Sequence, residues 1–171
     1  MRLRTDTALR KALYGLYVAL FVARQTSPED FHDGRITTML TAIMGIENCG
    51  WRVVGITKEA LELLATEDFN KNKLPRRFCR GHINDRIKTT RELFGQEKPM
   101  QIEKFFETFL HNDRTVIMLN EQNNHAAPFP KFIRIKNPDA ELFPSGSLMG
   151  WKHRMKERDF LRKLHSSLSM R

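Results

Sequence analysis

An apolar stretch near the start of the chain sets the strongest constraint on the fold. Read as a helix from Thr7 to Arg24, it is apolar on nearly every side, and Leu9, Leu13 and Leu20 lie along one of them. Such a helix needs protein contacts around most of its circumference. The sequence therefore predicts a first helix that is buried in the core of a mainly helical N-terminal part.

The same stretch also resembles a secretory signal peptide, since the basic segment from Met1 to Lys11 precedes the apolar segment from Ala12 to Ala23. Asp6 and Arg24 favour a helix that stays in the folded protein, and the chain lacks the cysteine usage of secreted proteins. The apolar segment is too short to span a bilayer. We therefore expect no integral membrane span and a cytoplasmic location.

Apolar spacing and capping residues predict four more helices and one strand before residue 110. They are a helix that opens at Ser27-Pro28-Glu29-Asp30 and ends near Gly50, a strand over 51–56, a helix over 57–64 capped by Thr57, and helices over 83–94 and 102–109. Between them, residues 70–80 are rich in Asn, Lys, Pro and Arg, which is typical of a loop.

The second half of the chain contains the most strand-like run, Thr115 to Leu119, and an alternating run from Lys131 to Lys136. We expect these two runs to form a small antiparallel sheet, followed by a basic helix from about Leu148. The predicted fold class is thus α+β. At 171 residues and 20.1 kDa, the chain is interpreted as a single domain over 1–171, with a candidate sub-boundary in the basic loop 70–80.

The net charge of +9 and the pI near 9.9 favour a polyanion as partner, nucleic acid first and an anionic membrane surface second. Charge runs are often only solvated faces, yet two clusters of bases stand out. The candidate nucleic-acid-binding residues are Arg76, Arg77, Arg80, Arg86, Lys88, Lys152 and Arg154.

A run of strand, loop with Asn124-His125, strand, loop with Asn137-Pro138-Asp139, and helix with His153 occupies the region from 115 to 156. This order resembles the ββα-metal core of HNH nucleases of restriction or phage type, over at most about a quarter of the chain. The acidic residue that commonly precedes the base of that motif is Asn124 here, and the bracing cysteine pairs are missing.

The resemblance implies a small metal-dependent DNA endonuclease, with DNA favoured over RNA. His125 would be the general base and Asn137 the amide that orients it, while His153, with Asp139 or Asp113, would hold a divalent metal such as Mg²⁺. The structural alternative for each histidine is a loop residue or a surface residue on a basic segment. In that case neither His125 nor His153 takes part in catalysis.

Two other functions fit the sequence. One is a non-catalytic DNA- or RNA-binding protein, and the other is a helical assembly or partner-binding protein, with an open oligomeric state. Cys49 and Cys79 form no pattern typical of a disulfide framework or a zinc site. The short echo between His82-Ile83-Asn84-Asp85-Arg86 and His111-Asn112-Asp113-Arg114 is interpreted as chance, because it is too brief to define a repeat.

Overall fold

The computed structural model describes residues 2–45, 50–124, 126–145 and 150–170. The elements, in chain order, are α1 (Arg2–Thr5), α2 (Thr7–Thr26), α3 (Asp33–Met44), β1 (Arg52–Ile56), α4 (Lys58–Ala65), the 3₁₀ turn η1 (Lys71–Lys73), β2 (Phe78–His82), α5 (Arg86–Phe94), α6 (Ile102–Asn112), β3 (Arg114–Leu119), the 3₁₀ turn η2 (Asn120–Gln122), β4 (Ile133–Arg134) and α7 (Met155–Ser169). The predicted α+β class is confirmed.

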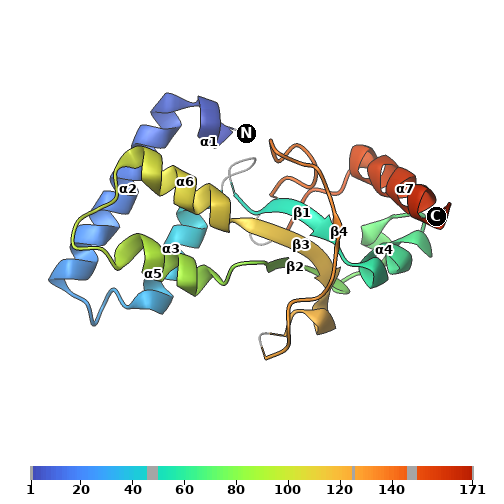
Figure 1. Ribbon diagram of the computed structural model, residues 1–171, viewed down its shortest axis with the longest axis horizontal. Helices are drawn as coiled ribbons and strands as arrows, with labels where there is room; N and C mark the ends of the chain where they lie inside the picture. Colours follow the sequence, from blue (N-terminus) through green and yellow to red (C-terminus); the bar gives the residue numbers. More distant parts are fainter. Residues whose placement is uncertain (1, 46–49, 125, 146–149, 171) are drawn as a thin grey trace.

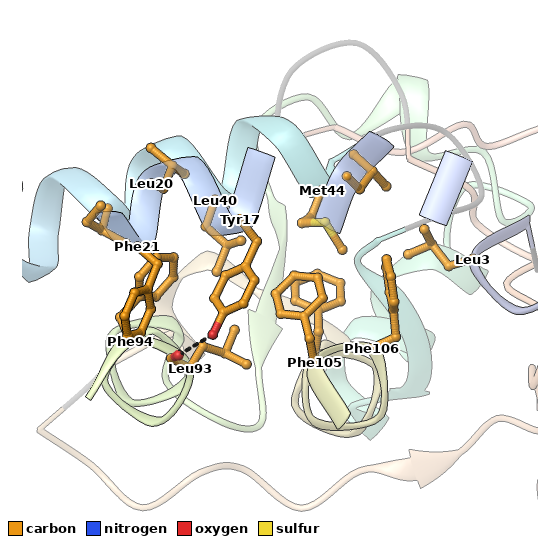
Figure 2. Packing of buried hydrophobic residues seen from close by; sticks show 13 residues of the cluster. Leu3, Tyr17, Leu20, Phe21, Leu40, Met44, Leu93, Phe94, Phe105 and Phe106 are labelled. Atoms are coloured by element: carbon orange, nitrogen blue, oxygen red, sulfur yellow. Dashed lines mark hydrogen bonds between the residues drawn. The ribbon is translucent and has the colours of Figure 1, made fainter. Parts of the chain in front are cut away.

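The helices α2, α3, α5 and α6 gather at one end of the molecule (Figure 1) and enclose an aromatic core. Tyr17 of the predicted first helix lies in its middle, stacked on Phe105 with ring centroids 4.3 Å apart. Its hydroxyl donates a hydrogen bond of 2.8 Å to the carbonyl of Leu93, drawn in Figure 2. α2 buries one face in this core, whereas Leu16 and Val22 on its other side are exposed, so the expected contacts around most of its circumference were wrong.

A four-stranded sheet lies between this helical end and the opposite end, in the order β2-β3-β1-β4. β3 pairs with β1 in parallel and with β2 in antiparallel fashion, and β4 pairs antiparallel with the other edge of β1. The sheet is therefore mixed rather than antiparallel. β3 and β4 were expected to pair with each other, but β1 lies between them, a long-range pairing that local sequence does not encode.

At the far end, α4 and α7 pack beside the sheet and form a second apolar cluster with it (Figure 1). Leu61 of α4, Leu161 of α7 and Ile117 of β3 are fully buried there. In the described parts of the chain, no helix combines the length and hydropathy that crossing a membrane requires.

Three predicted boundaries were wrong. α3 begins at Asp33 with His32 as its N-cap, and Ser27 instead ends α2. The predicted loop 70–80 contains the start of β2, whose ladder partner is β3. α7 begins only at Met155, because Trp151 forms an isolated bridge with Ser145 before the helix starts.

Candidate functional site

Three chain segments meet at the end of the sheet that faces the helical part, and their successive residues point to opposite sides. Each segment contributes two successive residues, and the three pairs are Trp51 and Arg52, His82 and Ile83, and Asp113 and Arg114. The first residue of each pair lines a pocket against the helices, and the second lines a groove on the other side. Trp51 has a positive φ of 62° and Asp113 is the C-cap of α6, so the division between the two sides follows from the backbone where each strand begins or ends.

The groove has an unusually basic lining. It holds about 1060 Å³ of open space, against about 370 Å³ for the pocket on the other side. Its wall is built from β1, β3, β4 and the residues around them, and the described residues that line it include no carboxylate but four cations: Arg52, Arg114, Arg134 and Lys136. We call this surface, with Phe132 and its other lining residues, the basic groove.

Two arginines of the basic groove lie side by side with few partners. Arg52 and Arg114 are register partners on the parallel strands β1 and β3, so two like charges face the same side. The Nε atoms of both are buried and have no hydrogen-bond partner among the described residues. In the part of the chain that the structure describes, Arg52 donates only to the carbonyls of Pro138 and Leu110, at 3.5 and 3.4 Å. Buried donors without partners carry a desolvation cost that an anion can remove.

The charge of Arg52 is held in an unfavourable environment. Burial lowers the pKa of its guanidinium, and the charges of Arg4 and Arg114 lower it further. Asp113 and Asp139 act in the opposite direction. Asp139 is half-exposed at the end of the groove, with its Oδ1 3.9 Å from an Arg4 nitrogen. The cations therefore repel each other more than the nearby acids attract them.

The pocket on the opposite side contains a buried histidine and aspartate. Nε2 of His82 lies 3.4 Å from Oδ1 of Asp113, and their side chains are only 10% and 7% exposed. The other Asp113 oxygen accepts a hydrogen bond from the backbone N–H of Trp51. The Trp51 ring packs edge-on against His82, with centroids 4.7 Å apart. Asp113 thus joins the starts of β1 and β3 to the end of β2.

The segments around His82 and Asp113 are the two stretches that resemble each other in sequence, and they contact each other. Asn84 donates to Asn112 at 2.9 Å, and the Ile83 N–H donates to the Arg114 carbonyl at 3.0 Å. The two similar stretches therefore lie against each other at one edge of the β2-β3 ladder. This proximity does not test the interpretation of the echo as chance, because similar stretches need not lie together.

Arg80, a predicted phosphate contact, lies inside the protein. It is 6% exposed, and its guanidinium donates to the carbonyls of Trp51 and Gly150 at 3.2 and 2.7 Å. It also lies over the Trp51 ring, 4.8 Å from the centroid. Burial lowers the pKa of Arg80 to about 10, against the opposing effect of Asp113. Arg80 ties the segments around residues 50 and 150 to β2.

The other predicted bases lie outside the lining of the basic groove. Arg76, Arg77 and Lys88 are exposed, and Arg77 lies 3.8 Å from Glu121. Arg86 donates to Thr41 in the wall of the His82 pocket. Lys152 and Arg154 precede α7, and Arg154 forms a 3.0 Å ion pair with the buried Glu157. Sequence reasoning missed the groove bases because they are spread over three segments that lie far apart in the chain.

Asn137 and His153, two residues of the predicted nuclease site, have partners within the fold. The Asn137 amide donates to the carbonyls of Val53 and Leu142 and accepts from the Leu142 N–H, so it closes the turn after β4. Nε2 of His153 lies 2.8 Å from the Phe69 carbonyl, which leaves the lone pair on Nδ1. That Nδ1 is buried without a partner among the described residues. Both assignments remain predictions.

His125, the predicted general base, lies outside the described residues. Within the ranges that the structure describes, no three His, Cys, Asp or Glu side chains come together as a metal-binding group. Asp113 lies beside His82 and accepts from the Trp51 N–H, whereas Asp139 and His153 lie in separate surroundings. A Mg²⁺ site therefore remains a prediction.

Comparison with models of protein families, with curated proteins and with solved structures yields no match for this chain.

Proposed function

We propose that this protein binds nucleic acid and that the basic groove holds the phosphate backbone. The observation that carries the proposal is the pairing of Arg52 with Arg114 on adjacent strands, with both buried Nε atoms unpartnered in the described structure. Two juxtaposed guanidinium groups match the charge and the hydrogen-bonding geometry of phosphate oxygens. A phosphate between them would supply the missing acceptors and reduce the repulsion.

The shape and the charge of the groove support a polymer rather than a single ion. Arg134 and Lys136 extend the cationic lining along β4, and neither has an ion pair within the described residues. Several phosphates in a row are the usual partners of such a series of bases. The net charge of +9 would speed association with the same polyanion.

Metal-dependent cleavage of DNA is the more specific form of this proposal, and its support is the resemblance to HNH nucleases. It requires a role for His125 and a metal at His153, with Asp139 or Asp113. The resemblance also favours DNA over RNA, and the cysteine usage favours a cytoplasmic protein. Incubating the protein with long DNA, with and without Mg²⁺, and comparing it with His125→Ala tests the catalytic form separately from binding.

The binding proposal is tested with a labelled oligonucleotide whose fluorescence anisotropy is followed from about 0.05 to about 0.2 M salt. We expect Arg114→Gln to weaken binding by about tenfold or more at low salt and to reduce the salt dependence by about one counterion. Its stability should be unchanged or slightly raised, because one of two facing like charges is removed.

Lys98→Gln serves as a matched control, since Lys98 is an exposed base outside the groove lining and outside the predicted basic clusters. The double change Arg76→Gln/Arg77→Gln tests the basic segment that the sequence predicted. If that double change abolishes binding while Arg114→Gln has no effect, the groove is not the binding surface. If the unmodified protein binds no nucleic acid at low salt, the proposed function is wrong.

A further inference from the structure

Two phenylalanines lie beside the bases of the groove. Phe132 belongs to the groove lining, directly before β4. Phe129, on the segment that leads to it, is 38% exposed, which is high for a large apolar side chain. Their rings meet edge to face, with centroids 6.1 Å apart and planes at 88°. The pair therefore presents aromatic surface next to a cationic lining.

The floor of the groove is shaped to receive the Phe132 ring. A Cβ atom at Gly55 of β1 would lie 2.2 Å from Cδ2 of Phe132, which no side chain permits. The glycine lets the ring lie directly against the strand. Phe132 is thereby held in place, and Phe129 packs on its edge with one part open to solvent.

Cations that line a groove, combined with exposed aromatic rings, are the usual elements of single-strand recognition. In a single strand the faces of the bases are free and stack on aromatic side chains, while the backbone follows the cations. A duplex keeps its base faces buried in its own stack. It is also too stiff to follow a recess, so it would reach the rim residues Arg134 and Lys136 before the recessed Arg52 and Arg114.

We infer that the occupant of the basic groove is a single-stranded nucleic acid, with phosphates on Arg52 and Arg114 and a base stacked on Phe129. The inference rests on the proposed function, because it specifies the ligand of the same surface. It adds the conformation of the strand to the sequence-based expectation of a nucleic-acid partner, and it applies to DNA and RNA alike.

The test compares two labelled probes of about 12 nucleotides, an oligothymidine and a mixed-sequence duplex, in one buffer. We expect the single strand to bind at least about tenfold more tightly than the duplex. Phe129→Leu should weaken single-strand binding by about fivefold or more, because stacking on the ring is lost, and should leave duplex binding unchanged. An oligouridine of equal length shows whether the sugar matters.

Leu168→Ala is the matched control, since Leu168 is an apolar residue of α7 that is 39% exposed and lies outside the groove lining. Phe129→Leu changes a partly exposed side chain outside both apolar clusters, so its fold should persist even if Phe132→Leu fails to fold. Far-ultraviolet circular dichroism confirms the fold of each variant.

The outcomes separate the two proposals. Equal binding of both probes, with Phe129→Leu silent and Arg114→Gln impaired, would overturn the single-strand inference and leave the proposed function standing. Binding of neither probe would overturn both. Preference for the single strand that persists unchanged in Phe129→Leu would exclude the aromatic contact and with it this mode of recognition.

Discussion

The charges of Arg52 and Arg114 contribute little to the stability of the fold. Two facing guanidinium groups repel each other, and their buried Nε atoms lack acceptors in the described structure. Arg80 is more deeply buried, and it donates to carbonyls at the shorter distances of 3.2 and 2.7 Å and lies over the Trp51 ring. At the residue scale, this contrast separates an arginine that holds the fold together from two that are suited to an external ligand.

His153 gives a prediction about pH at the same scale. Burial lowers the pKa of its imidazole, while the hydrogen bond to the Phe69 carbonyl partly opposes the shift. The unfolded chain therefore takes up this proton first as the pH falls below about 6.5. We expect stability to decrease from about pH 7 to about pH 5, and to decrease less in His153→Gln, which keeps a donor for Phe69.

The measurement is the free energy of unfolding in urea at several pH values, taken as the difference between the protein and the variant. The carboxylates titrate in both proteins and cancel in that difference. Parallel pH dependences of the two proteins would contradict a neutral, buried His153.

The sequence could identify some residue roles but not others. Thr57 was predicted as a helix cap and is one, because capping depends on three neighbouring residues. The roles of Arg80 and Asn137 depend on segments that lie far away in the chain. Composition alone made Arg80 look like part of an exposed basic cluster, since burial is set by tertiary packing.

At the scale of elements, the junction of β1 and α4 depends on one hydroxyl group. Thr57 is fully buried, and its Oγ1 accepts from the Ala60 N–H at 3.3 Å and donates to Gln122 Oε1 at 2.8 Å. The same Gln122 oxygen accepts the Leu119 N–H at 3.0 Å. The cap of α4 is thereby connected to the turn that follows β3.

We expect Thr57→Ala to lower the free energy of unfolding by about 1–2 kcal/mol, since the helix loses its cap and Gln122 loses a donor. Thr57→Ser keeps the hydroxyl group and should lose much less. Chemical denaturation of both variants provides the comparison. An unchanged stability of Thr57→Ala would show that the hydrogen bonds are replaced by others.

Among the elements, helices and the strand β3 were predicted well, whereas the sheet was not. The helix over 7–24 and the strand over 115–119 can be recognised from the local pattern of apolar residues, which does not depend on the rest of the fold. β2 was hidden because Arg76 and Arg77 gave its surroundings the composition of a loop. The position of β1 between β3 and β4 depends on pairing across more than fifty residues, which composition does not report.

At the scale of the molecule, two apolar clusters lie on either side of the sheet end that carries the groove and the His82 pocket. One is aromatic and lies among α2, α3, α5 and α6, and the other joins α4 and α7 to the sheet. If the chain is one domain, as the sequence predicts, both clusters should unfold together.

Both tryptophans, Trp51 and Trp151, are buried near the sheet, so their fluorescence reports on that region, while circular dichroism follows the helices. We expect the two signals to change at the same urea concentration. Leu61→Ala in the second cluster should lower both midpoints together, at a cost of about 2–4 kcal/mol. Leu16→Ala, at a residue 48% exposed, should shift neither. A shift of the fluorescence alone would indicate two independently folding units.

The alternation at the sheet end also limits how the gene can change. Trp51 and Arg52, His82 and Ile83, and Asp113 and Arg114 each divide between the interior pocket and the basic groove. Inserting or deleting a single residue there would turn the groove residue of a pair inward and its pocket residue outward. A substitution at one of these positions changes a single side chain, whereas a change in length moves several side chains to the wrong side at once. We therefore expect length variation among natural variants to be confined to the connecting loops.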